Sequence, residues 1–167
     1  MSMAQAGWLG VAMPESVGGA GLGITEAAVM MQAVAESGGG MTAASSIHGP
    51  GFGLEPVILF GTEEQQQRMI PPILSGAEKM CFAVTEPNTG LDTTSLKTRA
   101  EKVDGGYRVN GEKIWITNAH VADRMLLIAR TTPLEEVKRK TDGLTLFYTR
   151  LDREHIEHRL IPKMGRH

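Results

Sequence analysis

Residues 79–101 read KMCFAVTEPNTGLDTTSLKTRAE, and within this stretch the hydrophobic periodicity of the chain changes. Before it, apolar residues recur at helical spacing, whereas Met80–Thr85 and Leu96–Glu101 alternate residue by residue. Alternation with a period of two is typical of β-strands, because successive side chains point to opposite faces of the sheet. The stretch therefore predicts the beginning of a β region, with a boundary near Glu78.

The chain beyond this stretch carries further strand and turn signals. Asp104-Gly105-Gly106 predicts a turn, and Asn110-Gly111 is a strong signal for a two-residue hairpin. Thr131–Asp142 is charged, contains a proline and predicts a loop. Strands are expected at Tyr107–Val109, Lys113–Thr117, Arg124–Arg130, Leu144–Thr149 and His155–Ile161.

The N-terminal half carries helix signals. Thr25 is expected to cap the first helix, which Gly38-Gly39-Gly40 ends. Gly49-Pro50-Gly51 predicts a helix break, and Thr62 with Gln65 fits a capping box. Helices are expected over Glu26–Glu36, Thr42–His48, Leu54–Phe60 and from Thr62 to about Leu74.

Helices followed by strands predict an α+β fold. We expect an incomplete N-terminal helical subdomain over residues 1–78, followed by a mostly antiparallel domain, similar to a β-barrel or β-sandwich, over residues 79–167. A chain of 167 residues is long enough to bury a sizeable core without disulfides or metals.

Composition excludes several functional classes. The net charge is −2, with 17 basic and 19 acidic residues, and they form no basic stripe that would favour a nucleic-acid partner. No apolar run is long enough to span a membrane. The single cysteine, Cys81, cannot form an internal disulfide and indicates a reducing compartment. The five histidines are scattered, so no metal site is expected.

Two segments offer ligand-binding chemistry. In Val84–Asp92, Pro87 and Gly90 predict a turn whose backbone N–H groups can surround an anion, although a plain surface turn is the commoner case. Trp115 next to Thr117 offers a flat apolar wall and a hydroxyl to an aromatic ligand, although an isolated tryptophan more often lies in a core.

Taken together, in this order and spacing, the two segments resemble the signature of the acyl-CoA dehydrogenase family. The resemblance rests on CFAVTEP (81–87), Gly90, Asp92, KTRA (97–100), Tyr107, NG (110–111), Lys113 and WITN (115–118). It extends to GWLG (7–10), MPE (13–15), GGAG (18–21), FGTEEQ (60–65), PPILSG (71–76) and KMG (163–165). Nearly the whole chain is covered.

The resemblance implies an FAD-dependent oxidoreductase of fatty-acid metabolism. In this family a carboxylate removes the α-proton of an acyl-CoA thioester, and the β-hydrogen leaves as hydride to flavin N5. The resemblance also implies acyl-CoA as the substrate and a homo-oligomer, a dimer or tetramer, for the full-length protein. The expected location is the cytoplasm, or the mitochondrial matrix for a processed eukaryotic protein.

The resemblance also assigns site residues. Thr85 would hydrogen-bond the pyrimidine side of the flavin, Gly90 and Leu91 would lie near the pyrophosphate, and the Trp115–Thr117 segment would form a wall against the ring. The helix Thr42–His48 would line the acyl tail. The cofactor-binding residues implied are Phe82, Val84, Thr85, Gly90, Leu91, Trp115, Ile116 and Thr117.

Two departures from the family pattern affect function. Leu91, the one residue implied to bind the substrate, stands where the family commonly has serine, so a hydroxyl is missing there. The family's catalytic glutamate lies on a C-terminal helical bundle beyond His167, so no catalytic residue is assigned. Glu86 and Asp92 are interpreted as structural acids that cap the turn or pair with Lys97 or Arg99.

We therefore expect a fragment of an acyl-CoA dehydrogenase that is inactive alone. Two alternatives stay open. One is a β module that binds a ligand or a protein without catalysis, and the other is a related flavin oxidase or monooxygenase.

Overall fold

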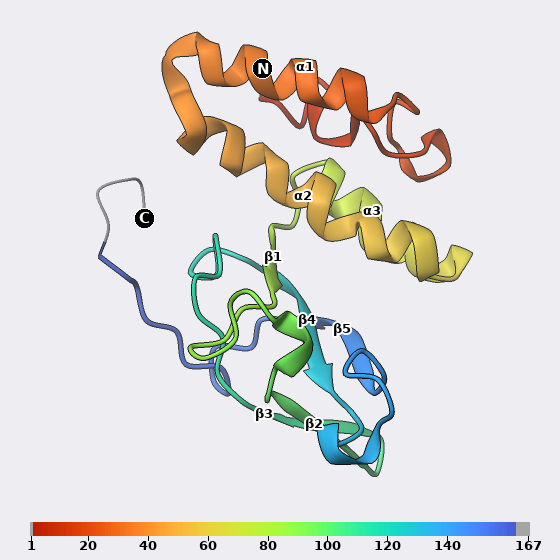
Figure 1. The fold of residues 1–167 in the computed structure, drawn as a ribbon. Helices are drawn as coiled ribbons and strands as arrows, with labels where there is room; N and C mark the ends of the chain where they lie inside the picture. Colours follow the sequence, from red (N-terminus) through yellow and green to blue (C-terminus); the bar gives the residue numbers. More distant parts are fainter. Residues whose placement is uncertain (1, 163–167) are drawn as a thin grey trace. The chain divides into compact units, whose positions relative to one another are not determined.

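The computed structural model describes residues 2–162 of the chain. Contacts divide it into two compact units, which we name the helical unit, built from the residues up to Met80, and the sheet unit, Cys81–Ile161. Figure 1 shows the helices first and the strands second along the chain, which confirms the α+β expectation. The segment 163–165, part of the resemblance, lies outside the described residues.

The helical unit contains α1 (Ile24–Val34), α2 (Gly40–Phe60) and α3 (Glu63–Leu74). The capping box of α3 is confirmed, because the Gln65 N–H donates to Thr62 Oγ1 over 3.3 Å and the Thr62 N–H donates to Gln65 Oε1 over 2.8 Å. The end of the first helix at the glycine triplet is also confirmed, since Gly38 has a φ of 96°, which lies outside the helical range.

Two helix expectations were wrong. Helix α1 begins one residue before Thr25, and its N-terminus is capped by the Glu26 carboxylate, which accepts a hydrogen bond of 2.9 Å from the Gly23 N–H. Helix α2 runs unbroken through residues 49–51. A proline removes only one backbone donor, and α2 buries Ala44, Leu54 and Val57, so tertiary packing outweighs the local preference.

The strands are β1 (Met80–Ala83), β2 (Arg99–Val103), β3 (Gly106–Asn110), β4 (Arg124–Arg130) and β5 (Leu144–Arg150). Apart from Met80, they lie in the sheet unit. The strand order is β1-β4-β2-β3, and β5 pairs with β4. The pairs β2–β3 and β4–β5 are antiparallel, whereas β2 and β4 meet in parallel at Arg99 and Arg130. The mostly antiparallel character is confirmed, but the sheet of the described residues is open and not a closed barrel.

Three β-region expectations were wrong. The hairpin turn lies at Asp104-Gly105, between Val103 and Gly106, and not at Asn110-Gly111. Lys113–Thr117 is not a strand, because Trp115 has a φ of 61°, which extended structure cannot accommodate. His155–Ile161 is not a strand either, because the Asp152 carbonyl accepts from the N–H groups of His155 and Ile156 and turns the chain.

The core of the sheet unit lies between β1, β4 and the segments that follow Asn110 and Arg150. Its buried members are Cys81, Ala83, Ala122, Met125, Leu127 and Leu151, and Ile116, Ala119, Phe147 and Ile156 pack against them. Within residues 2–162, no helix has both the length and the apolar composition that a membrane crossing requires.

Candidate functional site

The structure brings together the two segments that the sequence analysis expects to bind a ligand. The Ile114 N–H donates a hydrogen bond of 2.9 Å to the Thr85 carbonyl, and Lys113 Nζ donates one of 2.9 Å to the Val84 carbonyl. The residues that follow β1, Val84 and Thr85, therefore lie beside the segment that carries Trp115. Within residues 2–162 the two segments form no named strand pair, and the contact between them includes this backbone bond and the Lys113 side chain.

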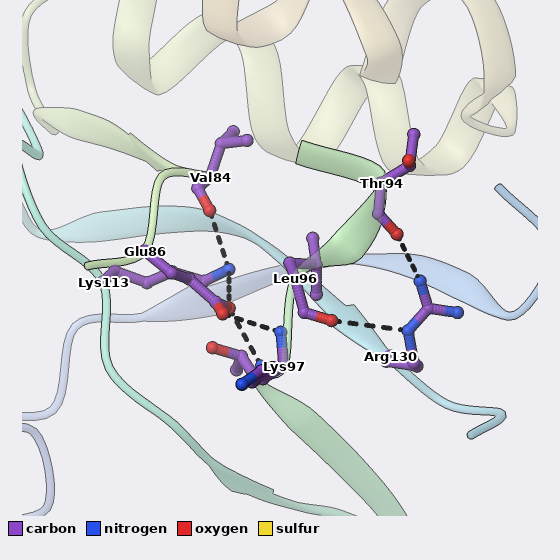
Figure 2. A network of polar contacts seen from close by, with 8 residues as sticks. Val84, Glu86, Thr94, Leu96, Lys97, Lys113 and Arg130 are labelled. Atoms are coloured by element: carbon purple, nitrogen blue, oxygen red, sulfur yellow. Dashed lines mark hydrogen bonds and ion pairs between the residues drawn. The ribbon is translucent and has the colours of Figure 1, made fainter. Parts of the chain in front are cut away.

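Glu86 is the centre of a buried polar network (Figure 2). Its side chain is 6% exposed and lies 2.9 Å from Lys113 Nζ, whose own side chain is 9% exposed. The carboxylate also accepts hydrogen bonds from the backbone N–H groups of Lys97, over 2.7 Å, and Thr98, over 2.9 Å. One side chain thus connects three segments of the sheet unit.

The network keeps Glu86 ionised. Burial by itself would raise the pKa of this carboxyl, but the hydrogen bonds from Thr98, the Lys97 backbone and Lys113 outweigh burial and lower the pKa to about 2. Burial lowers the pKa of Lys113, and the neighbouring Glu86 acts in the opposite direction. A carboxylate whose oxygens accept several hydrogen bonds in this way is a poor proton acceptor. This agrees with the interpretation of Glu86 as a structural acid. The expected pairing with Arg99 or the Lys97 side chain was wrong.

Asp92 is held at the surface of the same loop. Its carboxylate accepts from the hydroxyls of Thr94 and Ser95 and lies 2.9 Å from Lys140 Nζ. These contacts, Lys140 first, lower the pKa of Asp92. The structural interpretation therefore fits Asp92 as well, with Lys140 in place of the expected partners.

The turn between the two acids leaves its tip in solvent. Glu86 and Thr89 exchange backbone hydrogen bonds of 3.4 and 3.0 Å, closing the turn at Pro87-Asn88. A Cβ at Gly90 would meet no atom within 4 Å, and Leu91 is fully exposed. Gly90 and Leu91 are consequently accessible to a ligand, and neither is needed for packing.

Trp115 is 66% exposed, with a left-handed backbone at φ 61°. The alternative of a core tryptophan is therefore wrong for this residue. A bulky residue in this conformation is uncommon and is usually found where surrounding structure fixes it for a function. An exposed indole on a fixed backbone fits a flat aromatic ligand group, and the adjacent Ile116 packs back onto the core.

The remaining residues of the implied site lie on the same two segments. Phe82 and Val84, at and just beyond β1, are half-buried, as is Thr85, whereas Thr117 is exposed. The roles of all eight residues remain predictions.

Sequence reasoning missed one anchor of the site. Arg130, at the end of β4, is 5% exposed, and its guanidinium donates to the carbonyls of Thr94, Lys140 and Asp142 over 2.7, 2.9 and 3.0 Å. A charged residue that ends an apolar strand was the only signal in the sequence, and such an arginine usually lies in solvent.

Comparison with known domain families gives two matches that together cover almost the entire chain. The profile of the acyl-CoA dehydrogenase N-terminal domain matches residues 1–77, and that of the acyl-CoA dehydrogenase middle domain matches residues 81–167. The chain belongs to the acyl-CoA dehydrogenase family. The resemblance read from the sequence is thereby confirmed.

Individual acyl-CoA dehydrogenase relatives agree with this assignment. Mitochondrial isovaleryl-CoA dehydrogenase of Solanum tuberosum is 33% identical over 139 residues, which are 83% of this chain and 32% of the relative. The chain thus spans about a third of that relative's length.

Two solved structures are similar in fold. A prolyl acyl carrier protein oxidase, AnaB, has a TM-score of 0.82 and 32% identity, over 98% of this chain and 43% of that chain. A glutaryl-CoA dehydrogenase from Mycobacterium smegmatis, in complex with FADH2, has a TM-score of 0.77 and 26% identity, over 90% of this chain and 36% of that chain.

Proposed function

We propose that the protein to which this chain belongs is an FAD-dependent acyl-CoA dehydrogenase. The observation that carries the proposal is the contact of Val84 and Thr85 with Lys113 and Ile114, which joins the segment of the exposed Trp115 to the segment that leads into the accessible turn at Gly90. The glutaryl-CoA dehydrogenase of similar fold is described in complex with FADH2, which supports the choice of cofactor.

The residues of the chain suit a dinucleotide with a flat ring and a pyrophosphate. Trp115 offers the ring an apolar wall, and Thr117 offers a hydroxyl on the same segment. Thr85 offers both backbone and hydroxyl to the polar edge of the ring, while Gly90 and Leu91 offer exposed backbone to the pyrophosphate. When bound, FAD supplies the hydride acceptor for the β-hydrogen of the substrate.

The chain's own carboxylates at the site take a structural part. Glu86 and Asp92 are each fixed by several hydrogen bonds and an ion pair, so we assign neither as the base that removes the α-proton. These residues instead hold the cofactor loop in one position, which reduces the ordering required when a ligand binds.

We further propose acyl-CoA as the substrate and a homo-oligomer, a dimer or tetramer, as the working form. The name of the Solanum tuberosum relative, a mitochondrial isovaleryl-CoA dehydrogenase, supports an acyl-CoA substrate and a mitochondrial matrix location for a eukaryotic protein. For a protein that is not eukaryotic, we propose a cytoplasmic location. We place the boundary between the two family domains at residues 78 and 79.

A second function is favoured by one comparison. The similar structure of a prolyl acyl carrier protein oxidase shows that an oxidase can share this fold, so the chain could belong to a flavin oxidase that transfers electrons to oxygen.

The test is to express the complete reading frame that contains this chain and to examine the purified protein for bound flavin. Acyl-CoA added without oxygen should bleach the flavin absorbance. A dehydrogenase then stays bleached on exposure to air, whereas an oxidase recovers its colour and forms hydrogen peroxide. Protein that binds no flavin, even after incubation with FAD, would contradict both functions and favour a non-catalytic binding module.

A further inference from the structure

Arg130 lies between two loops for which the described part of the chain shows no backbone hydrogen bond from one to the other. One loop, Asp92–Leu96, follows Gly90-Leu91 directly, and the other, residues 131–143, connects β4 to β5. The Arg130 guanidinium donates to the Thr94 carbonyl of the first loop over 2.7 Å, and at 3.5 Å it also faces the Leu96 carbonyl (Figure 2). It donates to the Lys140 and Asp142 carbonyls of the second loop.

The charge of Arg130 makes these contacts strong. Among the contacts described for residues 2–162, the partners of its guanidinium are all carbonyl oxygens. A buried cation has lost its hydrating water, and hydrogen bonds to carbonyl oxygens replace that water. The planar guanidinium has five donors in a fixed geometry, so it can serve several carbonyls from two directions at once. The two loops are therefore held at a fixed separation.

A second bridge joins the same two loops at the surface. Lys140 Nζ lies 2.9 Å from Asp92 Oδ2, and the Asp92 carboxylate also accepts from the Ser95 hydroxyl over 2.6 Å. Asp92 is the immediate neighbour of Leu91, so this bridge connects the second loop to the residue that follows the turn tip. The exposed bridge by itself is expected to contribute little, because water screens it, which leaves Arg130 as the main anchor.

We propose that Arg130 is a positioning residue that holds the Gly90-Leu91 turn in place for the cofactor, through the two loops it connects. The proposal rests on the proposed flavin function for its ligand, whereas the contacts themselves do not depend on it. The loop of residues 131–143 thereby takes part in positioning the Gly90-Leu91 turn.

The test compares Arg130→Lys with Met125→Ala in the complete reading frame. The lysine keeps the charge but cannot reach carbonyls of both loops, and Met125→Ala leaves a cavity in the sheet core. In the absence of flavin, Arg130→Lys should speed hydrogen exchange at the Ser95, Leu96 and Asp142 amides about tenfold relative to Met125→Ala. Arg130→Lys should also weaken FAD binding about tenfold, measured by flavin fluorescence, while Met125→Ala leaves FAD affinity unchanged.

Two results would overturn the proposal. One is unchanged exchange at the three amides in Arg130→Lys, and the other is an equal loss of FAD affinity in both variants, which would indicate general destabilisation. Lys138→Gln, an exposed change in the same loop, is the control for loop composition. A wild-type protein that binds no FAD would contradict the proposed function, while the exchange comparison would still show whether Arg130 holds the loops.

Discussion

At Glu86 and Lys113 two opposite charges lie in the interior of a small sheet unit, and each depends on the other. Burial of either charge alone is costly, and the carboxylate is further satisfied by the two backbone N–H groups of Lys97 and Thr98. The pair connects the two halves of the proposed site through side chains, so its loss should affect both stability and ligand binding.

Glu86→Gln should lower the free energy of unfolding by about 3 kcal/mol, because Lys113 is left buried without a counter-charge. Glu101→Gln is the matched control, since Glu101 forms an exposed ion pair of 3.2 Å with Arg99, and it should cost less than about 1 kcal/mol. Urea unfolding followed by circular dichroism gives both values. Equal losses in the two variants would contradict a structural role for the buried pair.

The stabilisation by Glu86 should depend on pH in the acidic range. Folding lowers the pKa of Glu86 from 4.5 to about 2, so between these values the unfolded chain binds a proton that the folded chain does not. The contribution is therefore complete above the unfolded pKa and is lost as the pH falls toward 2. The difference in unfolding free energy between wild type and Glu86→Gln should shrink over this range, measured by urea unfolding at successive pH values. A difference independent of pH would contradict this assignment.

Trp115 should contribute to ligand binding more than to stability. Trp115→Asn removes an exposed indole and introduces a residue that tolerates left-handed backbone, so the unfolding free energy should change by less than about 1 kcal/mol. Flavin retention should fall markedly in the same variant. Trp8→Asn is the control, because Trp8 is also exposed, at 47%, but belongs to the helical unit. Equal flavin content in the two variants would argue against the ring wall.

At the scale of elements, the residue that precedes β2 and the residue that follows β3 approach each other closely, at Thr98 and Gly111. A Cβ at residue 111 would lie 2.7 Å from Thr98 Cα, a distance that only backbone movement can relieve. Thr98 also donates its N–H to Glu86, so this close approach lies next to the buried network.

Gly111→Ala should therefore destabilise the protein by about 2 kcal/mol through overpacking. Gly106→Ala is the matched control in the same hairpin, because a Cβ there meets no atom within 4 Å and should cost less than about 1 kcal/mol. Thermal unfolding of both variants measures the two losses of stability. A larger loss in Gly106→Ala would mean that the close approach at Gly111 is readily relaxed.

Local sequence predicted those elements whose structure depends on neighbours along the chain. Strand β4, strand β5 and the capped start of α3 were all found where alternation or the Thr62–Gln65 pattern placed them. The segment around Trp115 was not, because its alternation resembled a strand while a lysine contact with Glu86, 27 residues away, determines its path.

The candidate site was also predictable only in part. The two segments that the structure brings together were both recognised from their residues and spacing, because the signature lies within them. Arg130 was not recognised, because its contacts are with carbonyl groups of two loops that are distant in sequence. Every residue has a backbone carbonyl, so residue types do not predict where carbonyls converge. The ligand roles of Thr85, Leu91 and the other implied residues are still predictions.

At the scale of the whole chain, the helical unit and the sheet unit each have a core of their own. Leu54, Ile70 and Ile73 are almost fully buried in the first, and the Cys81–Leu151 cluster forms the second. A change that affects one core need not affect the other, and additivity is expected for sites without shared partners.

Thr62→Ala and Glu86→Gln should therefore act on different units. Thr62→Ala removes the cap of α3, which costs about 1 kcal/mol, and should speed hydrogen exchange in the helical unit only. Glu86→Gln should speed exchange in the sheet unit only. Thr62→Ser, which keeps the capping hydroxyl, is the control. Faster exchange throughout the chain in either variant would show that the two units open together.

The single cysteine of these 167 residues gives the sheet unit a natural reporter. Cys81 is 3% exposed in the core of the sheet unit, and burial, opposed by Arg153, raises the pKa of its thiol to about 11. Since a thiolate is the reactive form, an alkylating reagent should modify Cys81 only after the sheet unit opens. The rate of labelling by a thiol reagent under native conditions would then measure that opening directly, without any engineered probe.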